Sequence, residues 1–230
     1  LSEPGAVEVA GPSTADDVRA VAERMLALGA EQVLIDGAID RRAASSPAVA
    51  DGLVMATGAI LGEDIDDVVA RTSDAVDLVR LPAVAERDEQ RPGASDSEQS
   101  ITLERRLVLN AEPPEIAVLL RGHPDVSSFV IEGALGERFL EGLLTARRER
   151  AKRALKLIVG DPTKVFLSRH GPRWYQRQGL SIEVLRSIEL KAITVNPLAP
   201  QSHHFDSHML CELIATAVPD VPVLDVLAPA

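Results

Sequence analysis

The stretch that most constrains the fold of this chain is residues 33–42 (VLIDGAIDRR), where an apolar run ends abruptly in Asp36, Gly37 and a charged turn. A buried parallel strand has this pattern when it delivers an acid to the carboxyl edge of a sheet, the edge at which open α/β folds bind ligands. The pattern predicts a strand at 32–36. It makes Asp36 the first candidate for a functional residue.

The same order of residue types returns at residues 129–136 (FVIEGALG), where Glu132 is followed by Gly133 and an alanine. Two strands are therefore expected to present an acid followed by Gly-Ala, although two such short copies do not establish a repeat. The residues predicted to form the core of the sheet are Val33, Leu34, Ile35, Val54, Phe129, Val130 and Ile131.

Strand-like and helix-like segments alternate along the chain, and this alternation predicts an α/β fold. The expected architecture is a mostly parallel sheet with helices on both faces, Rossmann-like or P-loop-like. Strands are predicted at 7–10, 32–36, 52–60, 101–109, 127–131, 155–159, 165–167, 181–185, 190–195 and 221–226. Helices are predicted at 14–27, 63–79, 113–120, 136–150 and 206–217.

The first of these segments form a predicted β-α-β unit, in which two parallel strands flank a helix through a right-handed crossover. Ser13 or Thr14 can cap the helix, and Asp16 with Asp17 complements the dipole in its first turn. Gly29 is expected to end it.

Residues 83–100 are rich in Pro, Glu, Asp, Ser and Gln and hold almost no large apolar side chain. This composition predicts a mobile linker or surface loop, because such a segment cannot offset an ordering entropy of roughly 1–2 kcal/mol per residue. The segment divides an N-terminal α/β part, 1–82, from a C-terminal α/β part, 101–230. The two parts are either separate or one continuous domain.

A net charge of −11 argues against a nucleic-acid-binding surface, because phosphate contacts require a basic face. One local basic cluster is expected to be a solvated helix end. It consists of Arg147, Arg148, Arg150, Lys152 and Arg153.

Cys211 is the only cysteine, which excludes a disulfide framework and a cysteine cluster for zinc. It is expected to pack as a small apolar residue on a helix, in keeping with a reducing cytoplasm. No segment approaches the roughly 20 apolar residues that span a bilayer, and the first residues do not resemble a signal peptide. We therefore expect a soluble, cytoplasmic protein. The start at Leu1 is also consistent with a fragment of a longer protein.

Residues 11–14 (GPST) lie between a predicted strand and a predicted helix, a position at which helix N-termini bind phosphate. They lack the lysine and the flanking glycines of a P-loop, and Asp16 with Asp17 would repel a phosphate. Helix capping is the preferred interpretation of Ser13 and Thr14.

Asp36 resembles in form the strand-end acid that holds a magnesium ion through water in P-loop enzymes. The alternative is that Asp36 simply caps the following turn. Asp40, Arg41 and Arg42 form either a switch-like turn that senses a ligand or a set of surface ion pairs.

The densest set of ligand-type side chains is His203, His204, Asp206 and His208. His204 and His208 are four residues apart and are candidates to share a metal such as zinc or iron. Asp206 as a helix N-cap is the preferred alternative. For the only Trp and Tyr, at 174 and 175, surface packing is expected rather than stacking on a ligand.

Several stretches together resemble the lysine 5,6-aminomutase reactivase small-subunit family. The most specific stretch is 33–47, and the likeness extends over most of the chain outside 83–100. The segments that carry it are 7–14 (VEVAGPST), 33–41 (VLIDGAIDR), 44–47 (ASSP), 56–59 (ATGA), 193–197 (ITVNP) and 205–206 (FD).

The resemblance implies a role in restoring an adenosylcobalamin- and pyridoxal-phosphate-dependent aminomutase, whose damaged cobalamin is exchanged with the help of ATP. It implies an aminomutase or a second reactivase subunit as partner, with cobalamin reaching this chain only through the partner enzyme. The resemblance implies a nucleotide-binding segment upstream of residues 11–14. Because the sequence shows none, we expect either a truncated chain or a relative that no longer hydrolyses ATP. The residues expected to contribute to a site for ATP and magnesium are Asp36, Gly37, Asp40, Arg41, Ser13 and Thr14.

Two other functions remain open at this point. One is a magnesium-dependent nucleotide hydrolase that uses Asp36, and the other is a small-molecule-binding α/β module without chemistry of its own. The sequence leaves the oligomeric state open and gives no indication of binding to nucleic acid or to a membrane.

Overall fold

The computed structural model describes residues 11–12, 14–36, 45–84, 99–147, 154–200 and 203–226. The chain divides into two compact units, Leu1–Asp51 and Gly52–Ala230, and each is considered by itself. No helix in the described ranges combines the length and the apolar character needed to cross a membrane.

The first unit contains helix α1 (Ala15–Ala27), as the sequence predicts. Thr14 caps it by accepting the Asp17 N–H at 3.2 Å, and Asp16 and Asp17 occupy the first turn. Gly29 follows the helix with a φ of +102°, a conformation that favours glycine.

The predicted strand at 32–36 is wrong, because these residues have no regular secondary structure. Leu34 is 84% exposed, and Val33 and Ile35 are only half-buried, so none of the three belongs to a core. A short apolar run becomes a strand only where a neighbouring strand supplies hydrogen-bond partners, and the described part of the first unit contains no strand. The other strand of the predicted β-α-β unit, 7–10, lies outside the described residues.

The second unit contains three parallel sheets rather than one, and this confirms the α/β class with parallel strands. Sheet A has the order β1-β8-β9. Its strands are β1 (Gly52–Gly58), β8 (Glu189–Asn196) and β9 (Val223–Asp225). Because β1 pairs with β8, residues 52–58 fold together with the C-terminal part of the chain despite the 83–100 segment between them.

Two helices accompany sheet A, α2 (Ile65–Val79) and α7 (Ser207–Ala217), and a short 3-10 turn, η2 (Ala59–Leu61), precedes α2. Asp64 caps α2 and Asp206 caps α7, each by accepting a backbone N–H of the first turn. The role of Asp206 as an N-cap is therefore as expected.

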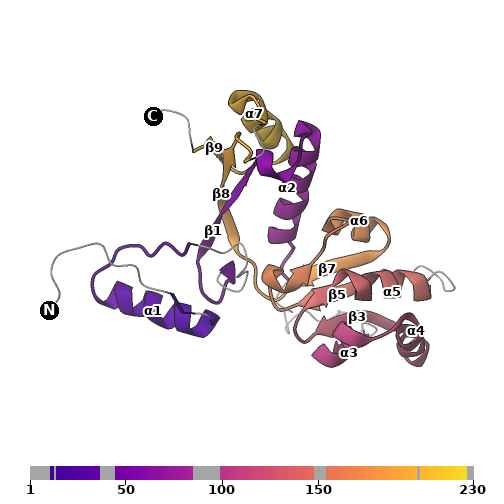
Figure 1. Cartoon of the computed structure of the whole chain (residues 1–230). Helices are drawn as coiled ribbons and strands as arrows, with labels where there is room; N and C mark the ends of the chain where they lie inside the picture. The colour runs from indigo at the N-terminus through magenta and orange to yellow at the C-terminus, as the bar shows by residue number, and fades with distance from the viewer. Residues whose placement is uncertain are drawn as a thin grey trace, which may run out of the picture. The chain divides into compact units, whose positions relative to one another are not determined.

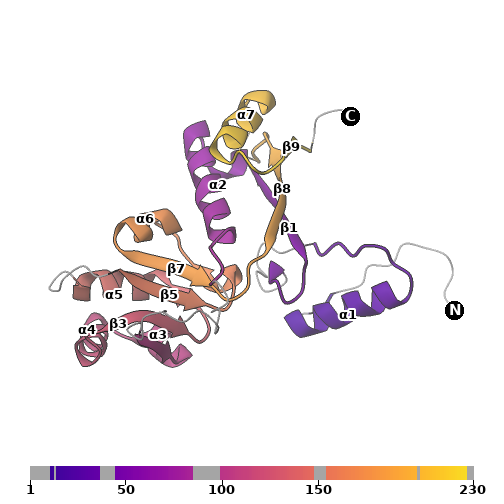
Figure 2. The same cartoon turned by 180° about the vertical axis from the view of Figure 1, so that it is seen from behind.

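Sheet B has the order β2-β3-β5-β7, and Figure 2 shows β3, β5 and β7 with the surrounding helices. Its strands are β2 (Gln99–Leu103), β3 (Val126–Ile131), β5 (Leu155–Val159) and β7 (Leu180–Val184). Its helices are α3 (Arg105–Asn110), α4 (Pro113–Gly122), α5 (Glu137–Arg147) and α6 (Pro172–Arg177). A small third sheet pairs β4 (Leu135–Gly136) with β6 (Val165–Phe166), and η3 (Pro162–Lys164) precedes β6.

The core of sheet B contains Phe129 and Ile131, as predicted, whereas Val130 points to the other face and is only half-buried. Tyr175 is also fully buried in this core, which makes the expected surface role for it wrong. The reason is that Tyr175 lies in α6 and faces the sheet, while the neighbouring Trp174 stays half-buried.

Two further predictions are wrong in detail. The strand predicted at 101–109 ends at Leu103, opposite the end of β3 at Ile131, because beyond that point its neighbour offers no further pairing. Val54 lies in β1 as expected but is 56% exposed rather than in the core.

The prediction that 83–100 is mobile is wrong at both ends, because Val84 bonds to Val184 of β7 and Gln99 and Ser100 belong to β2. The rest of that segment, 85–98, lies outside the described residues.

Candidate functional site

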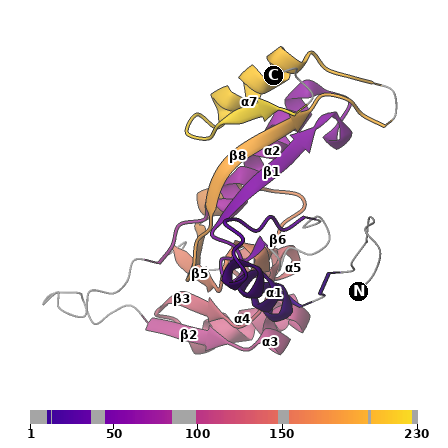
Figure 3. The ribbon, with the colours of Figure 1, turned by 90° about the vertical axis from the view of Figure 1, so that its left-hand side faces the viewer.

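Helices cover only one face of sheet A in the described part of the second unit. The side chains of Leu190, Ile193 and Val195 on β8 pack with Val68 and Val76 of α2 and with Leu210 and Ile214 of α7. Figure 1 shows both helices on the same side of β1 and β8, and Figure 3 shows β1 and β8 side by side with α2 behind them.

The opposite face of sheet A, called the open face below, is largely apolar. Val54 and Leu224 are 56% and 54% exposed, and the other three residues are exposed or half-buried. The strand register places these side chains in two adjacent rows. The residues of the open face are Val54, Ala56, Ala192, Thr194 and Leu224.

Strand β1 also presents an unprotected edge. It pairs with β8 on one side, has no strand partner on its other side among the described residues, and carries no charged side chain over Gly52–Gly58. Natural proteins usually protect an exposed edge of this kind with charge or proline. The edge and the open face meet at Val54 and Ala56, so the two features form one continuous surface.

The end of β1 is fixed closely against the end of β8. Gly58 has a φ of +154°, and a Cβ atom there would lie 2.0 Å from the Asn196 carbonyl oxygen, so only glycine fits. The buried Thr57 hydroxyl bonds the Thr72 hydroxyl of α2 at 2.6 Å. The Asn196 side-chain oxygen accepts the Leu198 N–H at 3.0 Å. These contacts join the end of β1 to α2 and the end of β8 to the loop that follows it.

The histidines near α7 do not converge on a metal site within the described residues. His203 Nε2 lies 3.0 Å from the Ala59 carbonyl and 3.1 Å from the Gly62 carbonyl, so it fixes the turn before α2. His208 Nδ1 lies 3.5 Å from Glu212, and His204 forms a backbone bridge with Leu198. No three His, Cys, Asp or Glu side chains gather around one point in the described ranges, so His204 and His208 have no third ligand there.

The residues predicted to bind ATP and magnesium are only partly described. Thr14 is engaged in capping, since its hydroxyl also donates to the Asp17 carboxylate at 2.6 Å. Asp36 is exposed in irregular backbone. Ser13, Gly37, Asp40 and Arg41 lie outside the described residues, so their contribution to such a site stays a prediction.

Ser207, Asp225 and Cys211 meet where α7 begins beside the end of β9. The Ser207 hydroxyl donates a hydrogen bond to the Asp225 carboxylate. Burial, together with the negative charge of Asp225, raises the pKa of the Cys211 thiol. The thiol is therefore protonated at neutral pH and is a poor nucleophile, which agrees with the packing role expected from the sequence.

The prediction that the basic cluster at the end of α5 is solvated is wrong for Arg147. Its side chain is buried, with 8% of the residue exposed, and its Nη1 donates to the Gly179 carbonyl at 3.0 Å. Burial lowers the pKa of its guanidinium. Arg147 thus ties the end of α5 to the turn before β7. The other four basic residues of the cluster lie outside the described residues.

Glu137, which sequence reasoning missed, is a carboxylate with several hydrogen-bond donors around it. It accepts hydrogen bonds from the Ser168 hydroxyl at 2.5 Å, the Arg169 N–H at 2.9 Å and the Tyr175 hydroxyl at 3.1 Å, and the His170 N–H lies 3.4 Å away. Burial alone would raise the pKa of Glu137, but these donors outweigh it and the net pKa is lowered. Burial, with Glu137 beside it, raises the pKa of Tyr175. The sequence offers no signal for this contact, because its partners lie about 30 residues or more apart.

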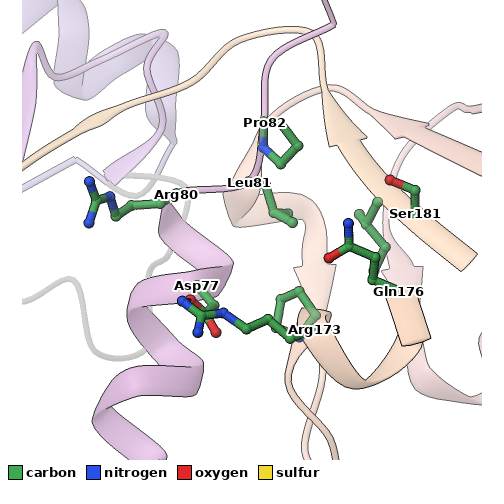
Figure 4. A pocket seen from close by; sticks show the side chains of 9 residues that line it. Asp77, Arg80, Leu81, Pro82, Arg173, Gln176 and Ser181 are labelled. Atoms are coloured by element: carbon green, nitrogen blue, oxygen red, sulfur yellow. Dashed lines mark ion pairs between the residues drawn. The ribbon is translucent and has the colours of Figure 1, made fainter. Parts of the chain in front are cut away.

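A cavity of about 320 Å³ lies between the C-terminal end of α2, helix α6 and strand β7 (Figure 4). Arg173 of α6 pairs with Asp77 of α2 at 2.6 Å. Burial raises the pKa of Asp77, and the Arg173 charge partly offsets that rise. Figure 4 shows Leu81, Pro82, Gln176 and Ser181 together along the cavity, whereas the Arg80 side chain points away from them.

Comparison with protein-family models, with curated proteins and with solved structures finds no match to this chain.

Proposed function

We propose that this chain is a binding component of a protein assembly that restores an adenosylcobalamin-dependent aminomutase. In this proposal the chain contacts either the aminomutase or a second reactivase subunit, and the contact is made by the open face of sheet A. The chain acts by binding and carries out no chemical step at this surface.

The observation that carries the proposal is the apolar open face of a parallel sheet. Parallel sheets are normally covered on both faces, and their strands are apolar for that reason. In sheet A one face packs against α2 and α7, whereas Val54, Ala56 and Leu224 on the other face are exposed. Contiguous apolar surface of this kind marks a site of protein interaction.

The identity of the partner comes from the sequence resemblance to the reactivase small-subunit family. Damaged cobalamin would be exchanged on the partner enzyme, and ATP would supply the free energy of the exchange. A contribution of Asp36 to a site for magnesium and ATP belongs to the same proposal.

The proposal is tested by measuring the affinity of the purified chain for purified lysine 5,6-aminomutase, and separately for a second reactivase subunit. The variants Val54→Lys and Leu224→Lys place a charge on the open face. Burying an unpaired ammonium is costly, so each variant is expected to bind at least about tenfold more weakly, the equivalent of about 1.4 kcal/mol.

Val118→Lys is the matched control, because Val118 is a comparably exposed apolar residue, at 59%, on α4 beside sheet B. This variant should bind as the natural chain does. All three variants should melt at nearly the same temperature, since substitutions at exposed positions usually change stability by no more than about 0.5 kcal/mol. Equal affinity of the natural chain and both open-face variants would contradict the claim that the open face makes the contact. Failure of the natural chain to bind either protein would contradict the choice of partner.

A second measurement tests the activity itself. The natural chain, together with its partner subunit, ATP and adenosylcobalamin, should restore turnover of an inactivated aminomutase. Leu224→Lys should reduce this recovery, and Val118→Lys should not. Recovery that is independent of the chain would contradict the reactivase role even if binding is observed.

A further inference from the structure

Helix α1 of the first unit carries an apolar stripe that runs along the helix to its C-cap. Its residues, called the α1 stripe below, are Val18, Val21, Met25 and Leu28. Their spacing alternates between three and four residues, which is typical of a seam between two helices. Val21, Met25 and Leu28 are 44%, 48% and 74% exposed, and no residue of α1 is buried.

A helix of this length needs a cover for its apolar side. α1 has 13 residues, and isolated helices of about 12–15 residues or fewer are only marginally stable in water. Arg19 pairs with Asp16 at 3.3 Å and with Glu23 at 3.9 Å, but exposed pairs of this kind contribute only about 0.3–0.5 kcal/mol each. Most of the stability of such a helix comes from packing of its apolar side. We therefore expect a second surface to cover the α1 stripe.

Two charges beside the α1 stripe indicate which surface this is. Asp17 and Arg24 are seven residues apart, so helical spacing places them on the same side of the stripe, separated by two turns. The Asp17 carboxylate accepts a hydrogen bond from the Thr14 hydroxyl rather than from a cation. Arg24 has no ion-pair partner among the described residues. The stripe is thus flanked by an acid at its start and a base at its end.

This arrangement is complementary to a second copy of α1 in the opposite direction. When two identical helices pack antiparallel, the same side of each helix meets across the interface. If they overlap along their full length, Asp17 of each copy faces Arg24 of the other. Val21 then lies at the centre of the interface against its counterpart, and Val18 lies against Met25.

A parallel pair of helices lacks this complementarity. It would bring the side with Asp17 and Arg24 against the other side of the partner's stripe. That other side holds Ala15, Ala22 and Gly29 and carries no charge. The charges therefore favour the antiparallel pair.

We propose that α1 pairs antiparallel with the α1 of a second copy of this chain, so that both α1 stripes are buried and two Asp17–Arg24 ion pairs form. The interface is small, so the dimer is weak and depends on concentration. The proposal concerns the first unit alone and does not depend on the function proposed for the open face of sheet A.

Sedimentation equilibrium of the full chain, from micromolar to millimolar concentration, tests whether it dimerises reversibly. Val21→Lys buries an ammonium group at the centre of the interface and should weaken dimerisation at least about tenfold. Ala20→Lys is the matched control, because Ala20 is exposed on the opposite side of α1 and the new residue is again lysine, a good helix former. This variant should dimerise as the natural chain does.

A charge exchange tests the ion pairs. Asp17→Arg and Arg24→Asp should each weaken dimerisation severalfold, because each places like charges opposite one another. The double variant restores opposite charges and should recover most of the affinity, although both of its charges oppose the dipole of their own helix. Glu23→Arg, on the outer side of α1, should leave the affinity unchanged.

Disulfide cross-linking tests the direction of the two helices. In a Cys211→Ser background, chains with Asp17→Cys are mixed with chains with Arg24→Cys. The two variants should link to each other faster than either links to itself, because in an antiparallel pair identical positions lie roughly 10 Å apart along the axis.

Three results would overturn the proposal. One is a chain that stays monomeric at millimolar concentration, which would mean that another surface covers the α1 stripe. The second is a dimer that is lost in Leu224→Lys but kept in Val21→Lys, which would assign the dimer to the open face of sheet A. The third is faster linking of each cysteine variant to itself than to the other.

Discussion

Sheets A and B are both parallel and both pack their helices on one face, but their other faces differ in chemistry. In sheet B the strand register aligns Ser100, Ser128, Lys156 and Ser181 in one row, and Thr102, Val130, Ile158 and Glu183 in the next. In sheet A the corresponding rows contain Val54, Ala56, Ala192, Thr194 and Leu224.

The more polar face of sheet B favours contact with water, whereas the apolar open face of sheet A favours contact with a protein partner. Each row of sheet B contains at least one hydroxyl group and a charge, although Ser128 in the first row is itself buried, with 4% of the residue exposed. The five residues of the open face carry a single hydroxyl group and no charge, with the Lys191 side chain beside Gly52 at one end of the face. Leaving these residues in water forgoes roughly 25 cal/mol for each Å² of apolar surface that a partner would bury. We therefore expect a partner to bind sheet A rather than sheet B, although both sheets are parallel.

The largest predicted effect contrasts the two faces of sheet A. Ile193→Ala removes a fully buried side chain and should lower the free energy of unfolding by about 2–5 kcal/mol. Leu224→Ala, on the open face, should change it by no more than about 0.5 kcal/mol in the isolated chain. Urea denaturation of both variants measures the contrast. Similar losses for the two would mean that the open face is already buried without a partner.

A smaller effect is predicted for Glu137, whose hydrogen bonds hold residues 168–175 against α5 beside sheet B. Glu137→Gln weakens charge-assisted hydrogen bonds of a partly solvent-screened carboxylate and should lower the free energy of unfolding by about 0.5–1.5 kcal/mol at pH 7. Because the pKa of Glu137 is lowered in the folded chain, its ionised form stabilises the fold. That stabilisation is complete above the ordinary glutamate pKa and is lost as the pH falls through the lowered folded value.

Denaturation of natural chain and variant as a function of pH tests this prediction. The difference between them should shrink on acidification. Glu141→Gln is the control, because Glu141 pairs with Arg169 at the surface and such pairs contribute only about 0–1 kcal/mol. A Glu137→Gln effect that is constant with pH would assign the loss to packing rather than to the charge.

The smallest predicted effect concerns Cys211, which reports on the covered face of sheet A. Its raised pKa should make it react more slowly at pH 7 than an unperturbed thiol. Asp225→Asn removes a negative charge that contributes to this rise, so it should accelerate the reaction with a disulfide reagent by a few fold. Binding of a partner to the open face should leave the rate unchanged, whereas protection of Cys211 would place the partner on the wrong side of the sheet.

Much of the fold follows from local sequence patterns. The helical spacing of apolar residues with Asp64 or Asp206 ahead of them predicts α2 and α7, and short apolar runs predict β1, β3, β5, β7 and β8. These elements are specified by their own residues, so their prediction needs no knowledge of their neighbours. The parallel arrangement follows from the alternation of strands with helices.

The errors arise where neighbours decide the outcome. The apolar run at 33–35 resembles a buried strand as closely as β3 does, yet it has no described strand beside it. Val54 matches a core residue in type, and its exposure depends on the absence of a described helix from one face of sheet A. The burial of Arg147 and Tyr175, and the bonds of Glu137, depend on contacts between elements far apart in the sequence.

The most direct test of the account is hydroxyl-radical footprinting of the chain alone and with the aminomutase or second reactivase subunit. The account predicts that Val54 and Leu224 are oxidised readily in the free chain and lose most of that reactivity in the complex, while Val118 reacts equally in both. Protection of Val54 and Leu224 already in the free chain, or unchanged oxidation in a complex shown to have formed, would contradict it.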